Sequence, residues 1–462
     1  MKHFDSVPPQ HVNTRIRRRR FLAYGAGALS AGTVFPAVLA AKEKAVAVHG
    51  RITITDIEVH RIWPETLDEI EYELNHHYGP RGPRYVYVVH TDNGLYGLGE
   101  GGPEPQEVLD QYIGSCPFDW VGDETSVSLY KAMYDLMGKA AGVPVYKLFG
   151  QKYRSWVPVG AWTVSTHPQR MADTVQYFAA MGYTWLKFHL SPFENIFDQF
   201  EAMQAVAPKG FKIQLDFTQY DSDDHPFDLL DKISRYPIAG LYEDPLNSKD
   251  VDGYIELRNR LRVPIARHAS VMRHTTDVLK RAADVYILGH YHLGIVMRRA
   301  GLFAAAGVPF SIQHTGGHIT RAMTTHMQAA FKTASFHFNS GTESWKSDVV
   351  NEPLQPVNGF VRVPERPGLG VTLNREELER LKTNNLPPAP RWIIKSRFEN
   401  GTMMYNIGGP GRAHFLVMPN KRLIPMSFAA PLTTEYWDED GSPEFNAMYK
   451  RLKTEEMVLT KK

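Results

Sequence analysis

The stretch "YTWLKFHLSP" ends a short apolar run with two residues that could transfer protons. Lys187 and His189 stand two positions apart, so a β-strand would point both side chains to the same face. There the amine and the imidazole could act as a general base and its partner, or they could form ion pairs with nearby carboxylates. Both roles stay open from this stretch alone.

Further ionisable residues close a series of similar β-rich runs. Such runs alternate with amphipathic helical stretches from Trp156 onward, which predicts eight strands of a (β/α) barrel. Chemistry in such barrels takes place where the strands end, so we expect the strand-end side chains to form one site. They are Lys187 and His189, Asp216 in "LDFTQ", Glu243 in "YEDPL", His268 in "IARHA", His290 and His292 in "GHYH", and His314 in "SIQHT".

The N-terminus predicts export. Four arginines, residues 17–20, precede a Gly- and Ala-rich segment that closes on small residues near Ala40, which is typical of a secretory signal. The pattern Arg-Arg-x-Phe-Leu resembles a twin-arginine signal. We expect the twin-arginine machinery to export the protein to the periplasm or beyond. The segment is too short and too Gly/Ala-rich to leave a stable membrane span after cleavage.

Composition excludes some function classes. Removing the leader, which carries a net charge of about +5, changes the net charge of +2 to about −3 for the mature chain. A near-neutral surface lacks the basic footprint of nucleic-acid binding. The single cysteine, Cys116, excludes an internal disulfide.

Four parts of the chain can be assigned. The turn Asp92-Asn93-Gly94 between two β-rich runs predicts a hairpin in a small α+β domain before the barrel. We assign residues 1–41 to the signal peptide, 51–155 to this α+β domain, 156–384 to the barrel with its return segment, and 385–462 to a C-terminal extension without a recognisable motif.

Four motifs together resemble the enolase superfamily, in its mandelate racemase and muconate-lactonising branch, from about Ile52 to Leu381. They are "VVHTDNGLYGLGE", "YKAMYDLMGKAAGVPVYKLFG", "LYEDPL" and "RPGLGV". The resemblance implies an α/β fold, a modified (β/α)7β TIM barrel with an N-terminal α+β capping domain. It also implies removal of the proton α to a carboxylate, with one divalent ion, Mg²⁺ in this family, stabilising the resulting anion.

The resemblance also implies roles for the strand-end residues. Asp216 and Glu243 match metal ligands, and His268 stands where the family usually has an acidic ligand. Because imidazole is a poor Mg²⁺ ligand, this set suits Zn²⁺, Mn²⁺ or Fe²⁺. Lys187 matches the base with His189 assisting it, His314 matches the acid, and His290 takes the catalytic place on the sixth strand, where Leu288 occupies the usual position.

The resemblance further implies substrate contacts in a capping loop and on the eighth strand. The candidates are His76, His77, Arg81 and Arg84 in "NHHYGPRGPR", and Asn339 and Glu343 in "FHFNSGTES". The expected function is an exported, metal-dependent sugar-acid dehydratase, assembled as a homo-oligomer. The alternatives are a racemase, epimerase or cycloisomerase of the same superfamily, a catalytically retired binding protein on this scaffold, and transition-metal chemistry outside the family's range.

Overall fold

The computed structural model describes residues 52–79, 81–191, 193–218, 226–268, 275–409, 432–455 and 457–461. The expected signal peptide lies outside the described residues, so it stays a prediction. Within the described part, no helix combines the length and the apolar character that crossing a bilayer requires.

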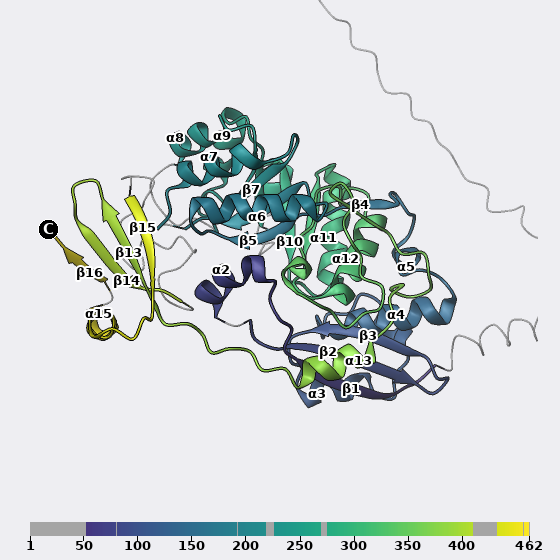
Figure 1. Cartoon of the computed structure of the whole chain (residues 1–462). Helices are drawn as coiled ribbons and strands as arrows, with labels where there is room; N and C mark the ends of the chain where they lie inside the picture. Colours follow the sequence, from purple (N-terminus) through teal and green to yellow (C-terminus); the bar gives the residue numbers. More distant parts are fainter. Residues whose placement is uncertain are drawn as a thin grey trace, which may run out of the picture. The chain divides into compact units, whose positions relative to one another are not determined.

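An antiparallel sheet, ordered β1-β2-β3, forms the first part of the structure (Figure 1). The predicted hairpin is confirmed, because β2 and β3 pair on either side of a turn in which Gly94 has a φ of 81°. This left-handed conformation favours glycine, which has no Cβ. The elements of this part are β1 (Ile54–Ile62), α2 (Asp68–Tyr78), β2 (Arg84–Thr91), β3 (Tyr96–Gly101), α3 (Gln106–Tyr112), the 3₁₀ turn η1 (Pro117–Trp120), α4 (Leu129–Ala141) and α5 (Tyr146–Phe149).

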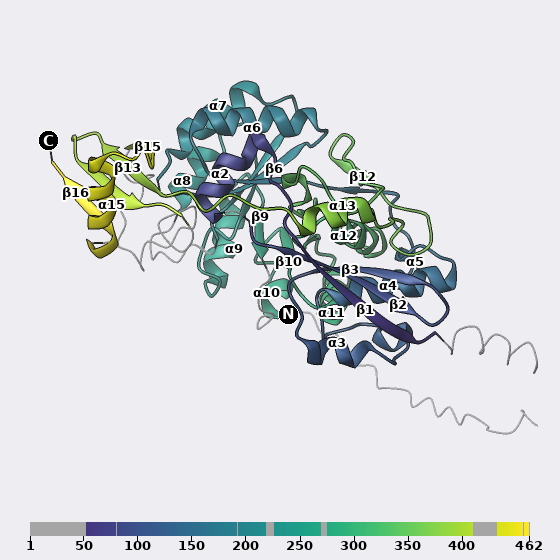
Figure 2. The same ribbon diagram turned by 60° about the horizontal axis from the view of Figure 1, so that its bottom comes forward.

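A curled parallel sheet of seven strands, ordered β11-β10-β9-β8-β7-β6-β5, follows. Helices alternate with the strands and lie outside the sheet, as Figure 1 and Figure 2 show. This is the predicted modified TIM barrel. Its elements are β5 (Ala161–Val164), α6 (Pro168–Ala180), β6 (Trp185–His189), α7 (Ile196–Val206), β7 (Lys212–Asp216), α8 (Phe227–Ile233), β8 (Ala239–Glu243), α9 (Val251–Arg260), β9 (Ile265–His268), α10 (Thr275–Leu279), β10 (Val285–Gly289), α11 (Leu293–Ala306), β11 (Phe310–Gln313) and α12 (His318–Ala330).

The first and last predicted strands of the barrel differ from expectation. The first divides into β4 (Trp156–Pro158) and β5, and β4 pairs with β12 (Phe360–Arg362) instead of joining the parallel sheet. The eighth is reduced to a single parallel bridge between Val159 and Phe338. One reason is that the Asn339 side chain donates to the backbone oxygen of Ala161 at 3.0 Å, so a side chain occupies an acceptor that a ladder would use.

The C-terminal extension forms a separate antiparallel sheet, ordered β15-β13-β14-β16. It hydrogen-bonds to α2 of its own chain, because Trp392 Nε1 donates to the backbone oxygen of His76 at 3.0 Å. The remaining elements are the 3₁₀ turn η2 (Thr342–Ser344), α13 (Arg375–Lys382), β13 (Trp392–Phe398), β14 (Met403–Ile407), β15 (Leu432–Asp438), α15 (Pro443–Glu455) and β16 (Met457–Thr460).

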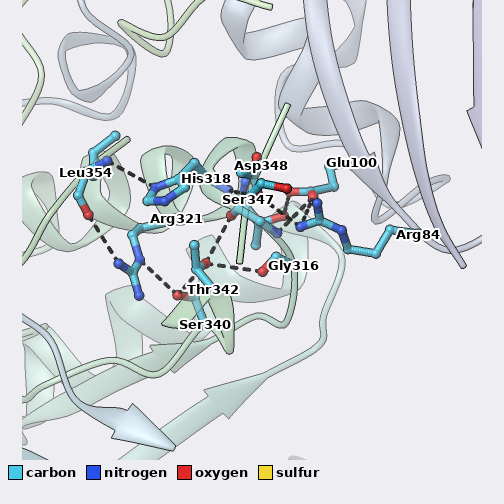
Figure 3. A network of polar contacts seen from close by, with 12 residues as sticks. Arg84, Glu100, Gly316, His318, Arg321, Ser340, Thr342, Ser347, Asp348 and Leu354 are labelled. Carbon is cyan, nitrogen blue, oxygen red and sulfur yellow. Dashed lines mark hydrogen bonds and ion pairs between the residues drawn. The ribbon is translucent and has the colours of Figure 1, made fainter. Parts of the chain in front are cut away.

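Helix α12 connects the N-terminal sheet to the barrel. All of its residues are buried, and the Glu100 carboxylate from β3 accepts hydrogen bonds from the backbone nitrogens of Gly317 and Thr320 at its start (Figure 3). A carboxylate is favourable there because a helix N-terminus presents unpaired N–H groups and partial positive charge. Arg84 Nη1 bonds Glu100 and Asp348 at 2.9 and 3.0 Å, which completes the junction.

Candidate active site

Lys187 lies at the centre of a buried ionic cluster at the ends of the barrel strands. Its Nζ contacts Asp216 Oδ2 at 2.9 Å and Glu243 Oε2 at 2.6 Å. His189 Nε2 also lies 3.1 Å from Asp216 Oδ2. The strand-end residues on β6, β7 and β8 are therefore brought together, as the barrel prediction requires. Two roles were left open for Lys187, that of a general base and that of an ion-pair partner. In the structure Lys187 forms ion pairs at the strand end where the resemblance expects the base.

The charges in this cluster stabilise one another. Burial disfavours the charged form of Lys187, but the carboxylates of Asp216 and Glu243 outweigh it and raise the pKa of the amine. Burial opposes ionisation of Asp216 too, yet Lys187 and His189 lower the pKa of this carboxyl group. In this arrangement the amine is protonated. A neutral, basic form of Lys187 would require other partners to engage the two carboxylates.

Two amide side chains hold Lys187 and Glu243 in place, and residue patterns did not predict either. Gln313 Oε1 accepts a hydrogen bond from Lys187 Nζ at 3.0 Å. Gln214 Nε2 donates to Glu243 Oε2 at 2.6 Å, and Gln214 Oε1 contacts His337 Nε2 at 2.5 Å. Gln214 and Gln313 alternate with apolar residues on their strands, and residue type alone does not show on which face of the strand each side chain lies. The sequence therefore did not identify these two positions.

Three potential metal ligands lie beside this cluster. Among the described residues, Glu243, Asp244 and His268 each offer a ligand atom within 4.8 Å of the other two. Glu243 Oε1 faces His268 Nδ1 at 3.3 Å, and Gly289 leaves the room for this ring, since a Cβ there would lie 2.1 Å from His268 Nε2. Two carboxylates and an imidazole fit Zn²⁺, Mn²⁺ or Fe²⁺ better than Mg²⁺.

The composition of this group differs from the expected set in one member. The sequence predicted Asp216 with Glu243 and His268, and this ligand set stays a prediction. The compact group contains Asp244 in place of Asp216, which contacts Lys187 and His189. Asp244 has a φ of 46°, which turns the chain sharply after β8. Burial, followed by the charge of Glu243, raises the pKa of Asp244 to about 7, although His268 acts in the opposite direction.

His314 follows β11, and its partner comes from the N-terminal domain. Its Nδ1 lies 3.1 Å from the Tyr130 hydroxyl, while its Nε2 has no hydrogen-bond partner among the described residues. Burial, then the charges of Lys131 and His290, lower the pKa of His314 well below its usual value. The Tyr130 hydroxyl, from α4, is thus a hydrogen-bond partner of this imidazole.

Helix α4 brings Tyr130 to this position because it packs very closely on β3. A Cβ added to Gly97 would lie 2.4 Å from the backbone oxygen of Ala132, and one added to Gly99 would lie 2.9 Å from that of Ser128. Only glycine permits this approach. The adjacent residue Lys131 is carried inward by the same packing.

A cavity of about 440 Å³ opens beside His314. The predicted substrate contacts Arg81 and Arg84 line it, together with His290 and a lysine that sequence reasoning missed, Lys131. His290 has a φ of 55°, and its Nδ1 lies 3.5 Å from Thr315 Oγ1. Although part of the residue is exposed, partial loss of solvent, followed by the positive charges of His268 and Lys187, lowers its pKa to about 4. The charge of Lys187 in the ionic cluster therefore lowers the pKa of His290, whose side chain also lines the cavity.

The other four predicted substrate contacts lie elsewhere. His76 and His77 belong to α2, where His76 Nε2 contacts Asp438 Oδ1 at 2.5 Å and His77 Nε2 contacts the backbone oxygen of Ser165 at 3.0 Å. The Glu343 carboxylate accepts from Arg321 Nη2 at 2.8 Å, and Asn339 holds the eighth barrel segment as described above. In this structure these contacts are structural, and a substrate role for the four residues stays a prediction.

The comparisons with known proteins bear on the barrel above all. Residues 170–378 match the family described as Enolase C-terminal domain-like. An arabinonate dehydratase from Saccharolobus solfataricus is 23% identical over 262 residues, which cover 54% of this chain and 70% of that protein. Relatives of similar identity are named D-gluconate and D-galactonate dehydratases.

Solved structures agree with this fold. The N-succinyl Arg/Lys racemase from Bacillus cereus superposes with a TM-score of 0.60 at 20% identity, over 72% of this chain and 98% of that one. An enolase from Pseudomonas fluorescens with bound magnesium, potassium and tartrate superposes with a TM-score of 0.59 at 20% identity, over 72% and 92% of the two chains.

Proposed function

We propose that this chain, which belongs to the enolase superfamily, is a metal-dependent sugar-acid dehydratase. The observation that carries the proposal is the position of Lys187, a buried amine in contact with two strand-end carboxylates beside a set of metal-binding side chains. The names of the sugar-acid dehydratases among its relatives support the substrate class. We also propose export through the twin-arginine pathway, on the residues of the leader alone.

In the proposed reaction, Lys187 removes the proton from the carbon next to the substrate carboxylate. His314 gives a proton to the hydroxyl on the following carbon, which leaves as water. The substrate thus loses one hydrogen and one hydroxyl group, and the enol that remains becomes a 2-keto-3-deoxy acid. Glu243, Asp244 and His268 would hold a divalent cation, which would supply positive charge to stabilise the anion formed on proton loss.

The remaining side chains set the protonation states that this reaction needs. Gln313 and Gln214 fix the positions of Lys187 and Glu243. His189 shares Asp216 with Lys187, because its Nε2 lies 3.1 Å from the carboxylate oxygen that the amine also contacts. An anionic substrate beside His314 raises the pKa of this imidazole and favours its role as a proton donor.

The experiment is a screen of sugar acids with Mg²⁺, Mn²⁺ or Zn²⁺, in which 2-keto-3-deoxy acids are detected. General-base catalysis contributes roughly 10²–10⁴-fold, so Lys187→Met is expected to lower the rate by at least 10². Lys212→Met is the matched control, because Lys212 begins the neighbouring strand β7 and its Nζ donates to the backbone oxygen of Pro237. Absence of product with every acid and metal, or full activity of Lys187→Met, overturns the proposal.

Epimerisation or racemisation is the second candidate. The observation that favours it is the presence of two groups able to transfer protons, Lys187 on β6 and His314 directly after β11. Such an enzyme incorporates solvent deuterium at the α-carbon and inverts it, but it forms no keto acid. The same incubations, performed in deuterium oxide, separate the two reactions.

A further inference from the structure

We infer that the substrate carries a second anionic group, which Lys131 and Arg81 bind in the cavity beside His314. The preferred substrate is then a sugar diacid, with one carboxylate next to the proton that Lys187 removes and another at the far end. This inference rests on the proposed function and narrows its substrate class.

The first observation is the charge of the cavity. Three cationic residues line it, Arg81, Arg84 and Lys131, while no aspartate or glutamate of the described residues does so. Arg84 is neutralised in part by Glu100 and Asp348. A cavity with this lining favours an anion over a neutral sugar chain.

The second observation is the state of Lys131, which is 2% exposed. Its Nζ donates to the backbone oxygens of Glu100 and Val127 at 2.8 and 2.6 Å. No ion pair joins it to a carboxylate of the described residues, so two of its three N–H groups are used and its charge lacks a direct counter-ion. Burial lowers the pKa of this amine to about 8, so it stays mostly protonated at neutral pH, and a bound anion would raise this pKa.

The third observation is a set of buried donors around the same cavity. Arg81 Nη1, Arg84 Nε and Nη2, Trp345 Nε1 and His314 Nε2 have no hydrogen-bond partner within the described part of the chain. Arg84 and His314 are 7% and 2% exposed. Leaving buried donors unpaired costs about 1–3 kcal/mol each, so a ligand with several acceptor oxygens is well matched to them.

Arg81 is held ready for such a ligand by stacking. Its guanidinium lies 4.3 Å from the centre of the Trp345 ring, which fixes its plane without using its N–H groups. The acidic residue that acts on it, Glu343, is already paired with Arg321 at 2.8 Å. Arg81 and Lys131 therefore provide two positive charges that have no direct counter-ion among the residues the structure describes.

The position of the cavity explains why we assign it to the far carboxylate of the substrate and not to the carboxylate next to the reacting carbon. The carboxylate next to the reacting carbon must lie near Lys187 and the Glu243 group, which do not line the cavity. His290 and His314 belong to the cavity wall, and the charges of Lys187 and Lys131 both act on His290. A chain of several carbons can thus have one end at each centre.

The test compares galactarate with D-galactonate, which differ only in that a carboxylate replaces the terminal hydroxymethyl group, by titration calorimetry with Mn²⁺ present. We expect galactarate to bind at least tenfold more tightly. Lys131→Met is expected to weaken galactarate binding at least tenfold and galactonate binding less than twofold. Arg81→Gln, which alters a partly exposed residue, should act in the same direction and serves if the first variant does not fold. Lys147→Met, at an exposed position on α5, is the control for charge removal.

Equal affinity for the two acids, or equal weakening of both by Lys131→Met, overturns the inference. Failure of both acids to bind also overturns it. Dehydration of a monoacid that is insensitive to Lys131→Met contradicts the diacid inference but leaves the proposed dehydratase standing, so the two can fail separately.

Discussion

At the scale of single residues, the site depends on competition for a few carboxylates. Glu243 contacts Lys187 through one oxygen and faces His268 with the other, so it belongs to both the ionic cluster and the candidate metal-binding group. Any ion bound by Glu243 and Asp244 reduces the negative charge available to Lys187. Metal binding and the basicity of Lys187 are therefore linked.

His268→Ala should weaken divalent metal binding by at least tenfold, because it removes one of three ligands. Elemental mass spectrometry of protein purified without chelator or nickel, followed by Zn²⁺ and Mn²⁺ titration, measures the effect. His292→Ala is the control, since His292 is a histidine before α11 that lies outside the metal-binding group. Unchanged metal affinity in His268→Ala would exclude this group as the metal site.

Residue patterns predicted the strand-end members of the site because β-strands place them on one edge of the sheet. Asp244 was not predicted beside Glu243 and His268, since its position depends on a φ of 46° that residue types do not specify. Lys131 and Tyr130 were missed for another reason. They belong to a helix whose inward face is set by the close packing of α4 on β3, a tertiary contact.

At the scale of elements, α12 is the helix on which the N-terminal domain and the barrel meet. Its start is held by Glu100 and its end carries His326, whose Nε2 donates to the backbone oxygen of Leu369 at 3.1 Å in the return segment. Burial lowers the pKa of His326 from its usual value to about 4. The folded protein therefore keeps this ring neutral where an unfolded chain would protonate it.

Acidification should destabilise the protein through His326. The unfolded state binds a proton below pH 6.5 and the folded state only near pH 4, so stability is full above pH 6.5 and decreases as pH falls through this window. The loss is about 1.4 kcal/mol per pH unit for one group. Urea unfolding measures how much the free energy of unfolding decreases between pH 7 and pH 5. This decrease should be smaller by roughly 2 kcal/mol in His326→Gln than in the unchanged protein. An identical pH dependence in the variant would contradict this account.

The order of elements was largely predictable, because helical and strand periodicities alternate regularly through the barrel. The short eighth strand was overestimated. "SFHFNS" has the alternation of a strand, but the Asn339 side chain and the bridge at Phe338 replace a ladder there. The alternation of residue types does not show that a side chain, here Asn339, will bond a backbone group that a strand ladder would otherwise use.

At the scale of the whole molecule, the C-terminal sheet is joined to α2, which leads into the segment that carries Arg81. Trp392 is fully buried and bonds the backbone of His76, while Asp438 accepts from the Tyr72 hydroxyl at 3.1 Å. The extension, which showed no motif in the sequence, therefore stabilises a helix next to the proposed substrate loop. Contacts between such distant segments are not encoded in local patterns.

Replacing Trp392 with Phe should loosen α2. The change removes the N–H donor to His76 and part of a buried side chain, at a cost of about 1–3 kcal/mol. Hydrogen exchange measured by mass spectrometry should become faster in peptides covering residues 68–84, with little change in the barrel strands. Trp156→Phe is the control, because Trp156 is 44% exposed. Equal exchange in the two variants would show that the extension does not stabilise α2.

The central claim is that Lys187 removes a proton next to a carboxylate. The most direct measurement incubates the metal-loaded protein with sugar mono- and diacids in deuterium oxide and follows the α-hydrogen signal by NMR. We predict that this signal disappears for at least one acid as a keto acid forms, and that Lys187→Met prevents both changes while Lys212→Met does not. Retention of the α-hydrogen in every acid, or its loss at an unchanged rate in Lys187→Met, would contradict the account.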